Sequence, residues 1–284
     1  MRSFTLCTLI TLLTATGTVP LYAAETCETV DASVLQNNRI ILGAPLLTGA
    51  VKSLRAVSLP DPEDFRQFST TTDIDFDPCG QITHFKFMRS EIRNKMQITR
   101  ILTASETADN ALYTLKNYRH RPGKKDLYPM VIETVFTKDA RQQITGGAGK
   151  MYVENNDTVM PGNVQVQFDN ARVSDILTHW PHLKTDQHFS FGYDENNRLA
   201  SVKSDNLSLL TQTYTYTQKG YPSTQEEAFD SDIVSNHYLT KCNDWDNHGN
   251  CTKEQITQQV IYGAPDGLKS ESSVIVHKTI RYYP

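Results

Sequence analysis

The sequence has 284 residues with 28 basic and 32 acidic side chains, so its formal net charge at pH 7 is −4. Nucleic acids and anionic membrane surfaces are bound through clustered Lys and Arg, and this mild acidity argues against both as partners. The length is sufficient for one large β domain, or two small ones, with a substantial core.

Residues 1–23 are predicted to be a cleavable signal peptide. Arg2 precedes an apolar stretch from Phe4 to Ala15, followed by helix-breaking and then small residues, which is the order of a secretory leader. This stretch is too short to span a bilayer, and no later segment comes closer. Cleavage after Ala23 removes one positive charge, so the mature chain, 24–284, carries −5. We expect one strand-rich mature domain without a membrane span, periplasmic or secreted.

Four cysteines remain after the leader is removed: Cys27, Cys79, Cys242 and Cys251. An even number in an exported chain predicts two disulfides, and four cysteines allow three connectivities. Cys242 and Cys251 flank a segment typical of a hairpin tip, which favours their pairing and leaves Cys27 with Cys79. A zinc site is disfavoured because the chain has no Cys-x-x-Cys spacing.

Alternation of apolar and polar residues predicts strands in several segments. Their β-branched and aromatic content supports this, and Asp, Asn, Gly and Pro turns separate them. The segments are Thr71–Phe76, Ile82–Met88, Asn163–Phe168, Thr211–Thr217 and Ser273–Tyr283. Helical candidates are few, namely Ser105–Asn117 and Arg172–His179. We therefore expect an all-β fold, an antiparallel meander of tandem hairpins forming a curved sheet with few short helices.

Acidic residues alternate at Asp73, Asp75 and Asp77, and a second group lies at Asp244 and Asp246. Neither group has the glycine and the closing glutamate of a calcium loop together, so turn caps are the favoured interpretation. The basic residues of 119–125 are interpreted as a solvated loop tip, and the glycine-rich 144–151 as a flexible turn.

Histidines gather at His179, His182 and His188, with Trp180 between them. Pro181 prevents the first two from sharing a helix face, so we expect no metal site but a polar loop with Trp180 packed inward. There is no Gly-x-Ser-x-Gly elbow, and paired cysteines offer no thiol nucleophile. The sequence therefore indicates no cofactor, no metal and no identifiable catalytic residue.

Four hairpin tips share an order of residues: an aromatic, usually Asp, two variable residues, Gly or Asn, a polar or aromatic residue, and usually an apolar one. The aromatic closes a strand, the Asp caps the turn, and Gly or Asn takes the positive φ that ends it. The four segments are Phe76–Ile82, Tyr193–Leu199, Tyr216–Pro222 and Trp245–Cys251.

This order resembles the YD repeat of Rhs-type proteins, with consensus Tyr-Asp-x-x-Gly-Arg-Leu. Tyr193–Val202 is the nearest copy, with Asn197 at the glycine position, and the resemblance is clearest over 185–284. In large members of that family many repeats wrap into a β-shell. Here the copies are too few to close a shell, so the resemblance implies an open curved meander with a binding or structural role.

Two functions remain open at this level. The first is a non-enzymatic exported β-protein that binds a protein or glycan of the cell envelope through turn aromatics. Those aromatics are Tyr193, Tyr216, Tyr221 and Trp245. The second is a hydrolase acting on envelope polysaccharide or peptide, with catalytic carboxylates that leave no local signature. The alternative for each ring is that it merely anchors its turn on the core face.

Overall fold

A computed structural model describes residues 30–59, 68–93, 96–120, 127–183, 186–204, 209–230, 234–263 and 268–284. The predicted signal peptide and Cys27 lie outside these ranges. The described residues form one α-helix, α1 (Ala32–Ile41), one 3-10 helix, η1 (Pro181–Leu183), and sixteen strands. No helix among them is long and apolar enough to cross a membrane.

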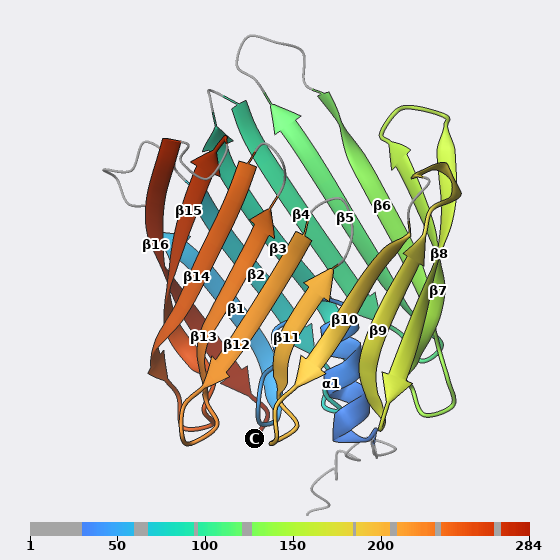
Figure 1. The fold of residues 1–284 in the computed structure, drawn as a ribbon. Helices are drawn as coiled ribbons and strands as arrows, with labels where there is room; N and C mark the ends of the chain where they lie inside the picture. The colour runs from blue at the N-terminus through green and yellow to red at the C-terminus, as the bar shows by residue number, and fades with distance from the viewer. Residues whose placement is uncertain are drawn as a thin grey trace, which may run out of the picture.

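The strands follow one another along the chain as antiparallel neighbours (Figure 1). Their bounds are β1 (Val51–Leu59), β2 (Phe68–Phe76), β3 (Ile82–Arg93), β4 (Met96–Glu106), β5 (Asn110–His120), β6 (Leu127–Lys138), β7 (Ile144–Val153), β8 (Val159–Asp169), β9 (Arg172–His179), β10 (Gln187–Tyr193), β11 (Leu199–Ser204), β12 (Leu209–Tyr216), β13 (Pro222–Asp230), β14 (Val234–Trp245), β15 (Cys251–Tyr262) and β16 (Leu268–Tyr282). All five strand segments expected from alternation are confirmed, as is the antiparallel all-β class.

The sheet closes into a barrel, because β1 pairs with β16 from Leu59↔Ile275 to Val51↔Tyr282. The expectation of an open curved sheet is therefore wrong. The expectation is based on the small number of repeat-like turns. These turns lie at one end of the barrel only, so their number is smaller than the number of strands. Closure also pairs the two edge strands, which would otherwise present free backbone groups.

Both expected helices are strands instead. Residues 172–179 form β9, where Val173 is fully buried and pairing with β8 and β10 overrides the local pattern. Residues 105–117 are broken by a turn in which the Thr107 amide donates to the Asn110 carbonyl over 2.8 Å. The glycine-rich 144–151 is strand β7 rather than a flexible turn.

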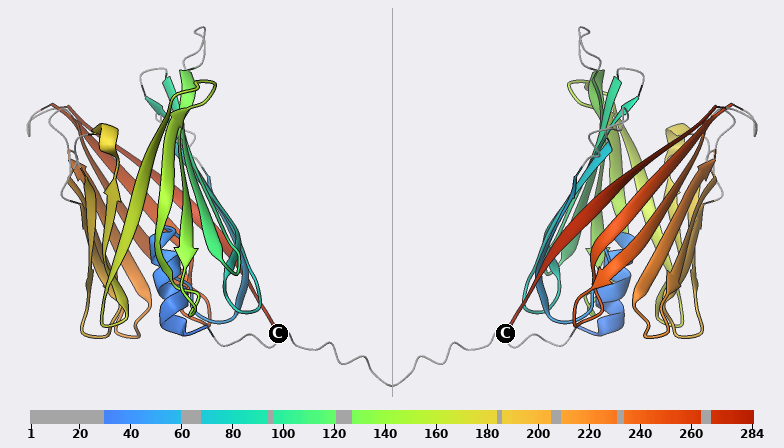
Figure 2. Two further views of the ribbon diagram at one scale, coloured as in Figure 1. Left: turned by 90° about the vertical axis from the view of Figure 1, so that its right-hand side faces the viewer. Right: turned by 90° about the vertical axis from the view of Figure 1, so that its left-hand side faces the viewer.

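Helix α1 is not among the expected elements, and it lies inside the barrel, between its walls, at the end with the short turns (Figures 1 and 2). Asp31 caps its first turn by accepting a hydrogen bond from the Ser33 amide over 2.8 Å. The Asn37 and Asn38 side chains accept hydrogen bonds from the amides of Val173 (3.3 Å) and Ile144 (2.9 Å), where β9 and β7 begin.

The main hydrophobic core surrounds this helix. Leu42 at its end is fully buried among inward side chains of β1 to β9, including Leu54, Ile74 and Phe85. Directly paired residues share a face of the sheet, so this core identifies which residues of every strand point inward. One end of the barrel is thus filled by a packed core.

Candidate functional site: the barrel interior

The aromatic residues of the turns are tied to neighbouring hairpins. The hydroxyls of Tyr193 and Tyr216 donate to the carbonyls of Val173 (2.9 Å) and Leu199 (2.8 Å), and the Trp245 indole donates to that of Pro222 (2.8 Å). Burial raises the pKa of the Tyr193 hydroxyl to about 12.

Tyr221 packs against Gly249, where a Cβ would meet its ring at 2.4 Å. These contacts give all four predicted binding rings a structural part in joining one hairpin to the next. A further contact with a partner stays a prediction.

Five turns in the described part of the chain share one geometry. The backbone amide of the first residue donates to the carbonyl four residues later, and its carbonyl accepts from the amide three residues later. At Asp194, the carboxylate accepts from the amides of Asn196 and Arg198, and the Arg198 side chain completes an ion pair of 2.6 Å. Burial raises the pKa of Asp194, but these hydrogen bonds outweigh it and the pKa is lowered. The fifth such turn, at Asp139, lacks the Gly or Asn signal because Gln142 takes the positive φ of 66°.

Asn197 has a φ of 66°, as the repeat pattern predicts, and β10, β11 and β12 are consecutive in the sheet. Replacing Asn197 with Gly should leave stability unchanged or slightly raised, since Gly adopts this conformation without a side-chain clash. Replacing it with Val should lower stability by about 1 kcal/mol or more. Thermal midpoints of the two variants test this; equal midpoints would mean that the turn tolerates a β-branched residue at positive φ.

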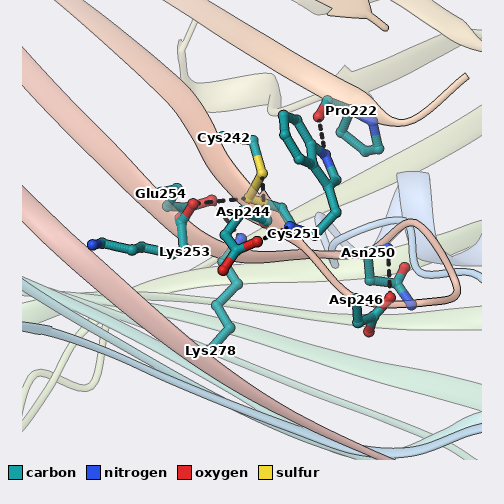
Figure 3. Close-up of a disulfide and its surroundings, with 10 residues drawn as sticks. Pro222, Cys242, Asp244, Asp246, Asn250, Cys251, Lys253, Glu254 and Lys278 are labelled. Carbon is teal, nitrogen blue, oxygen red and sulfur yellow. Dashed lines mark hydrogen bonds and ion pairs between the residues drawn. A yellow bond between two sulfur atoms is a disulfide. The ribbon is translucent and has the colours of Figure 1, made fainter. Parts of the chain in front are cut away.

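Cys242 and Cys251 form the expected disulfide between β14 and β15, with a Cα–Cα distance of 5.9 Å (Figure 3). Cys79 is also disulfide-bonded. Its pairing with Cys27, which lies outside the described ranges, stays a prediction. Glu254 and Lys278 form an ion pair beside the Cys242–Cys251 bridge (Figure 3).

Two of the three candidate metal-binding histidines contact aspartates instead. His188 contacts Asp175 at 2.7 Å and His179 contacts Asp186 at 2.5 Å, and the described ranges hold no group of three potential metal ligands. Arg55 pairs with Asp73 (3.1 Å) and Asp75 (2.7 Å). Asp77 and Asp246 cap turns through their carboxylates.

The outer face of the barrel is largely polar. The Arg55 ion pairs lie on it, each side chain 40–45% exposed, and so do Lys86, Lys203 and the threonines of β12 at 211, 213 and 215. Glu133 lies there too, bonded to Lys150 at 2.6 Å and to the Tyr152 hydroxyl at 2.8 Å. Exposed apolar side chains also lie on this face: Val57, Val159 and Leu239, and the directly paired Leu112 and Val135. A barrel embedded in lipid instead carries a continuous apolar band on this face.

The inner wall carries a continuous apolar row from β3 to β8. Successive pairings place Phe87, Leu102, Leu115, Ile132, Met151 and Met160 side by side. Met151 is buried, and the other five are partly exposed although they face inward. We call this set the apolar row. It lies nearer than the core around α1 to the end of the barrel opposite the short turns. We call this the long-loop end, and the half of the interior next to it the loop half.

Two residues further along each strand toward that end, on the same face, lies a second row of directly paired residues. It consists of Arg89, Arg100, Asn117, Met130 and Val153, and we call it the arginine row. Met130 and Val153 are 40% and 38% exposed. Across the barrel, Phe229 of β13 also faces inward and is 37% exposed. Apolar side chains in the loop half of the interior are thus accessible to solvent.

Trp180 packs inward, as expected, and is only 4% exposed. It continues β9 by one residue, so its ring lies over Gly162 of β8 and Gly149 of β7, where built Cβ atoms would meet it at 2.3 and 2.8 Å. Gly149 and Gly162 follow Met151 and Met160 on the same face. Trp180 therefore borders the end of the apolar row.

The wall formed by β12 to β16 is more polar. Gln212 donates to Glu227 over 2.7 Å, and Gln258 donates to the Tyr238 hydroxyl over 2.9 Å. Arg89 reaches across from β3, and its guanidinium carbon lies 3.9 Å from the centre of the Tyr238 ring. The interior thus has an apolar side and a polar side.

The fold and this interior define a closed, sixteen-stranded antiparallel barrel with a helix packed inside one end. No family model matches the chain, and no curated protein sequence does either. The solved structures similar to it include one described as a porin-like protein from Bacteroides uniformis ATCC 8492, with 10% sequence identity and a TM-score of 0.48. The match covers 82% of this chain and 98% of that one. At this identity it does not bear on what the present chain binds.

Proposed function

We propose that this protein is an exported, non-enzymatic barrel that binds an amphiphile of the cell envelope inside its loop half. The observation that carries this proposal is the apolar row, partly exposed on the inner wall of a barrel whose outer face is polar. Burying those side chains against an acyl chain is favourable by roughly 25 cal/mol per Å² of apolar area. The disulfide fits an oxidising compartment outside the cytoplasm.

The polar outer face supports placing the barrel in water rather than in lipid, because charged side chains facing the bilayer midplane are costly. Among the inward carboxylates, Glu106 and Glu254 are each held by a lysine, which does not favour the alternative of a hydrolase. Glu91 and Glu227 each accept a hydrogen bond from a glutamine. The YD-type turn geometry agrees with a structural use of the repeats, and membership of that family remains part of the proposal.

The test uses the full exported chain carrying Trp245→Phe, so that Trp180 is the remaining tryptophan of the mature protein. Fatty acids and monoacylglycerols brominated along the chain should quench Trp180 emission, because the ring borders the apolar row. Unbrominated lipids control for other effects on emission. Absence of saturable quenching with either lipid would contradict binding in the interior.

A matched pair of variants on β5 localises the site. Leu115→Gln alters the apolar row, whereas Leu112→Gln alters the outer face, where Leu112 is 45% exposed. We expect Leu115→Gln to weaken lipid binding about tenfold, since one inward apolar side chain contributes about 1.5 kcal/mol. Leu112→Gln should leave affinity unchanged. Equal losses for both would contradict an interior site.

A further inference from the structure

We infer that Arg89 and Arg100 bind the anionic head group of the amphiphile, a carboxylate or a phosphate, at the loop side of the apolar row. This inference rests on the proposed function. Arg89 and Arg100 are directly paired on β3 and β4, one step beyond the directly paired Phe87 and Leu102. An anionic group placed there would leave its chain along the apolar row.

The two arginines are directly opposed on β3 and β4. Directly opposed side chains have Cβ atoms about 4.5–5.5 Å apart, and like charges in this arrangement destabilise a sheet. The hydrogen bond that the structure gives Arg100 runs from Nε to the neutral Asn117 amide oxygen over 3.3 Å. Arg100 thus bonds a neutral acceptor and is exposed on the inner face, so its charge is available to an anion.

Arg89 is held in place by aromatic rings rather than by an acceptor. Its guanidinium carbon lies 5.0 Å from the centre of the Phe68 ring and 3.9 Å from that of Tyr238. Its Nε and Nη2 are buried and have no hydrogen-bond partner within the described ranges. Buried donors of this kind are costly, and native proteins usually satisfy them. An oxyanion is the acceptor that matches the planar fork of a guanidinium.

Glu91 is the acidic residue nearest along β3 on the same face, and Gln258 donates to it over 3.4 Å. It lies one step further toward the loops than Arg89, away from the apolar row. The charges directly beyond the apolar row on β3 and β4 are therefore positive, which favours an anionic over a neutral head group. Across the barrel, the inward Glu227 of β13 accepts a hydrogen bond from Gln212.

The experiment compares Arg100→Gln with Lys86→Gln in the Trp245→Phe chain. Arg100 is exposed on the inner face, so its loss should spare folding, and Lys86 is an exposed cation on the outer face of β3. Quenching titrations use brominated fatty acid, brominated phosphatidic acid and brominated monoacylglycerol. The first two distinguish a carboxylate from a phosphate head group, and the third is neutral.

We expect Arg100→Gln to weaken binding of at least one anionic lipid about tenfold or more, as for a lost charge-assisted hydrogen bond, with little effect on the neutral one. Lys86→Gln should change neither. Arg89→Lys, which keeps the charge but not the fork, should weaken the same anionic lipid. Equal affinity of the wild type for neutral and anionic lipids would overturn the head-group site alone. Failure of all three lipids to quench would overturn the proposed function with it.

Discussion

Replacing Lys138 with methionine is expected to lower the free energy of unfolding by about 3–5 kcal/mol, because it leaves a buried carboxylate without its cation. Lys138 and Glu106 form an ion pair of 2.6 Å, with side chains 0% and 1% exposed. Glu106 also accepts hydrogen bonds from the Asn38 side chain (3.2 Å) and the Ile82 amide (3.3 Å). The Glu106 carboxylate therefore links α1, β3 and β6. Without the Lys138 cation its negative charge is no longer neutralised, which should loosen the helix inside the barrel.

The measurement is denaturant unfolding of Lys138→Met beside Lys150→Met, which removes the cation of a pair on the outer face. The Lys150 side chain is 53% exposed, so water replaces its partner and the change should be far smaller. Adding Glu106→Gln to Lys138→Met should restore much of the stability, because the amide oxygen still accepts while the buried charge is gone. No recovery in the double variant would show that packing of the Lys138 stem, rather than charge, sets the loss.

Local chemistry explains why the strands and turns could be predicted from the sequence. Alternation marks a strand whichever sheet it joins, and the positive φ at Asn197 follows from its place in the turn. The turn at Asp139 was not predicted, because Gln142 is an unusual residue at a positive φ. Helix α1 was not predicted, because its buried face carries Asn37 and Asn38 rather than a continuous apolar stripe.

Closure and the interior site could not be predicted in the same way. Closure depends on β1 meeting β16, residues more than 200 positions apart, and no local pattern encodes that pairing. The apolar row becomes visible only when six strands are placed in register. The spacing of Phe85, Phe87 and Arg89 shows that they share one face of β3. It does not show whether that face lines the inside of a barrel or packs against a second layer.

The glycines under Trp180 lead to the second large expected effect, for Gly162→Val. Gly162 lies in β8, where the valine backbone would fit, but a Cβ there would lie 2.3 Å from the Trp180 ring. The indole must move off the wall, and overpacking of this kind costs about 1–3 kcal/mol before the lost burial of Trp180 is included. We expect a loss of about 3 kcal/mol in total, with Trp180 emission shifted to the red.

Gly192→Ala is the matched control, since Gly192 is also in a strand but its Cβ would meet the Ser201 hydroxyl at 2.5 Å, which can rotate away. Its midpoint and Trp180 emission should stay close to those of the parent in the Trp245→Phe chain. Adding Trp180→Leu to Gly162→Val should recover part of the stability, because the smaller side chain leaves room for the valine. If Gly162→Val unfolds like the parent with unchanged emission, the indole does not rest on this wall, and Trp180 could not report on the apolar row.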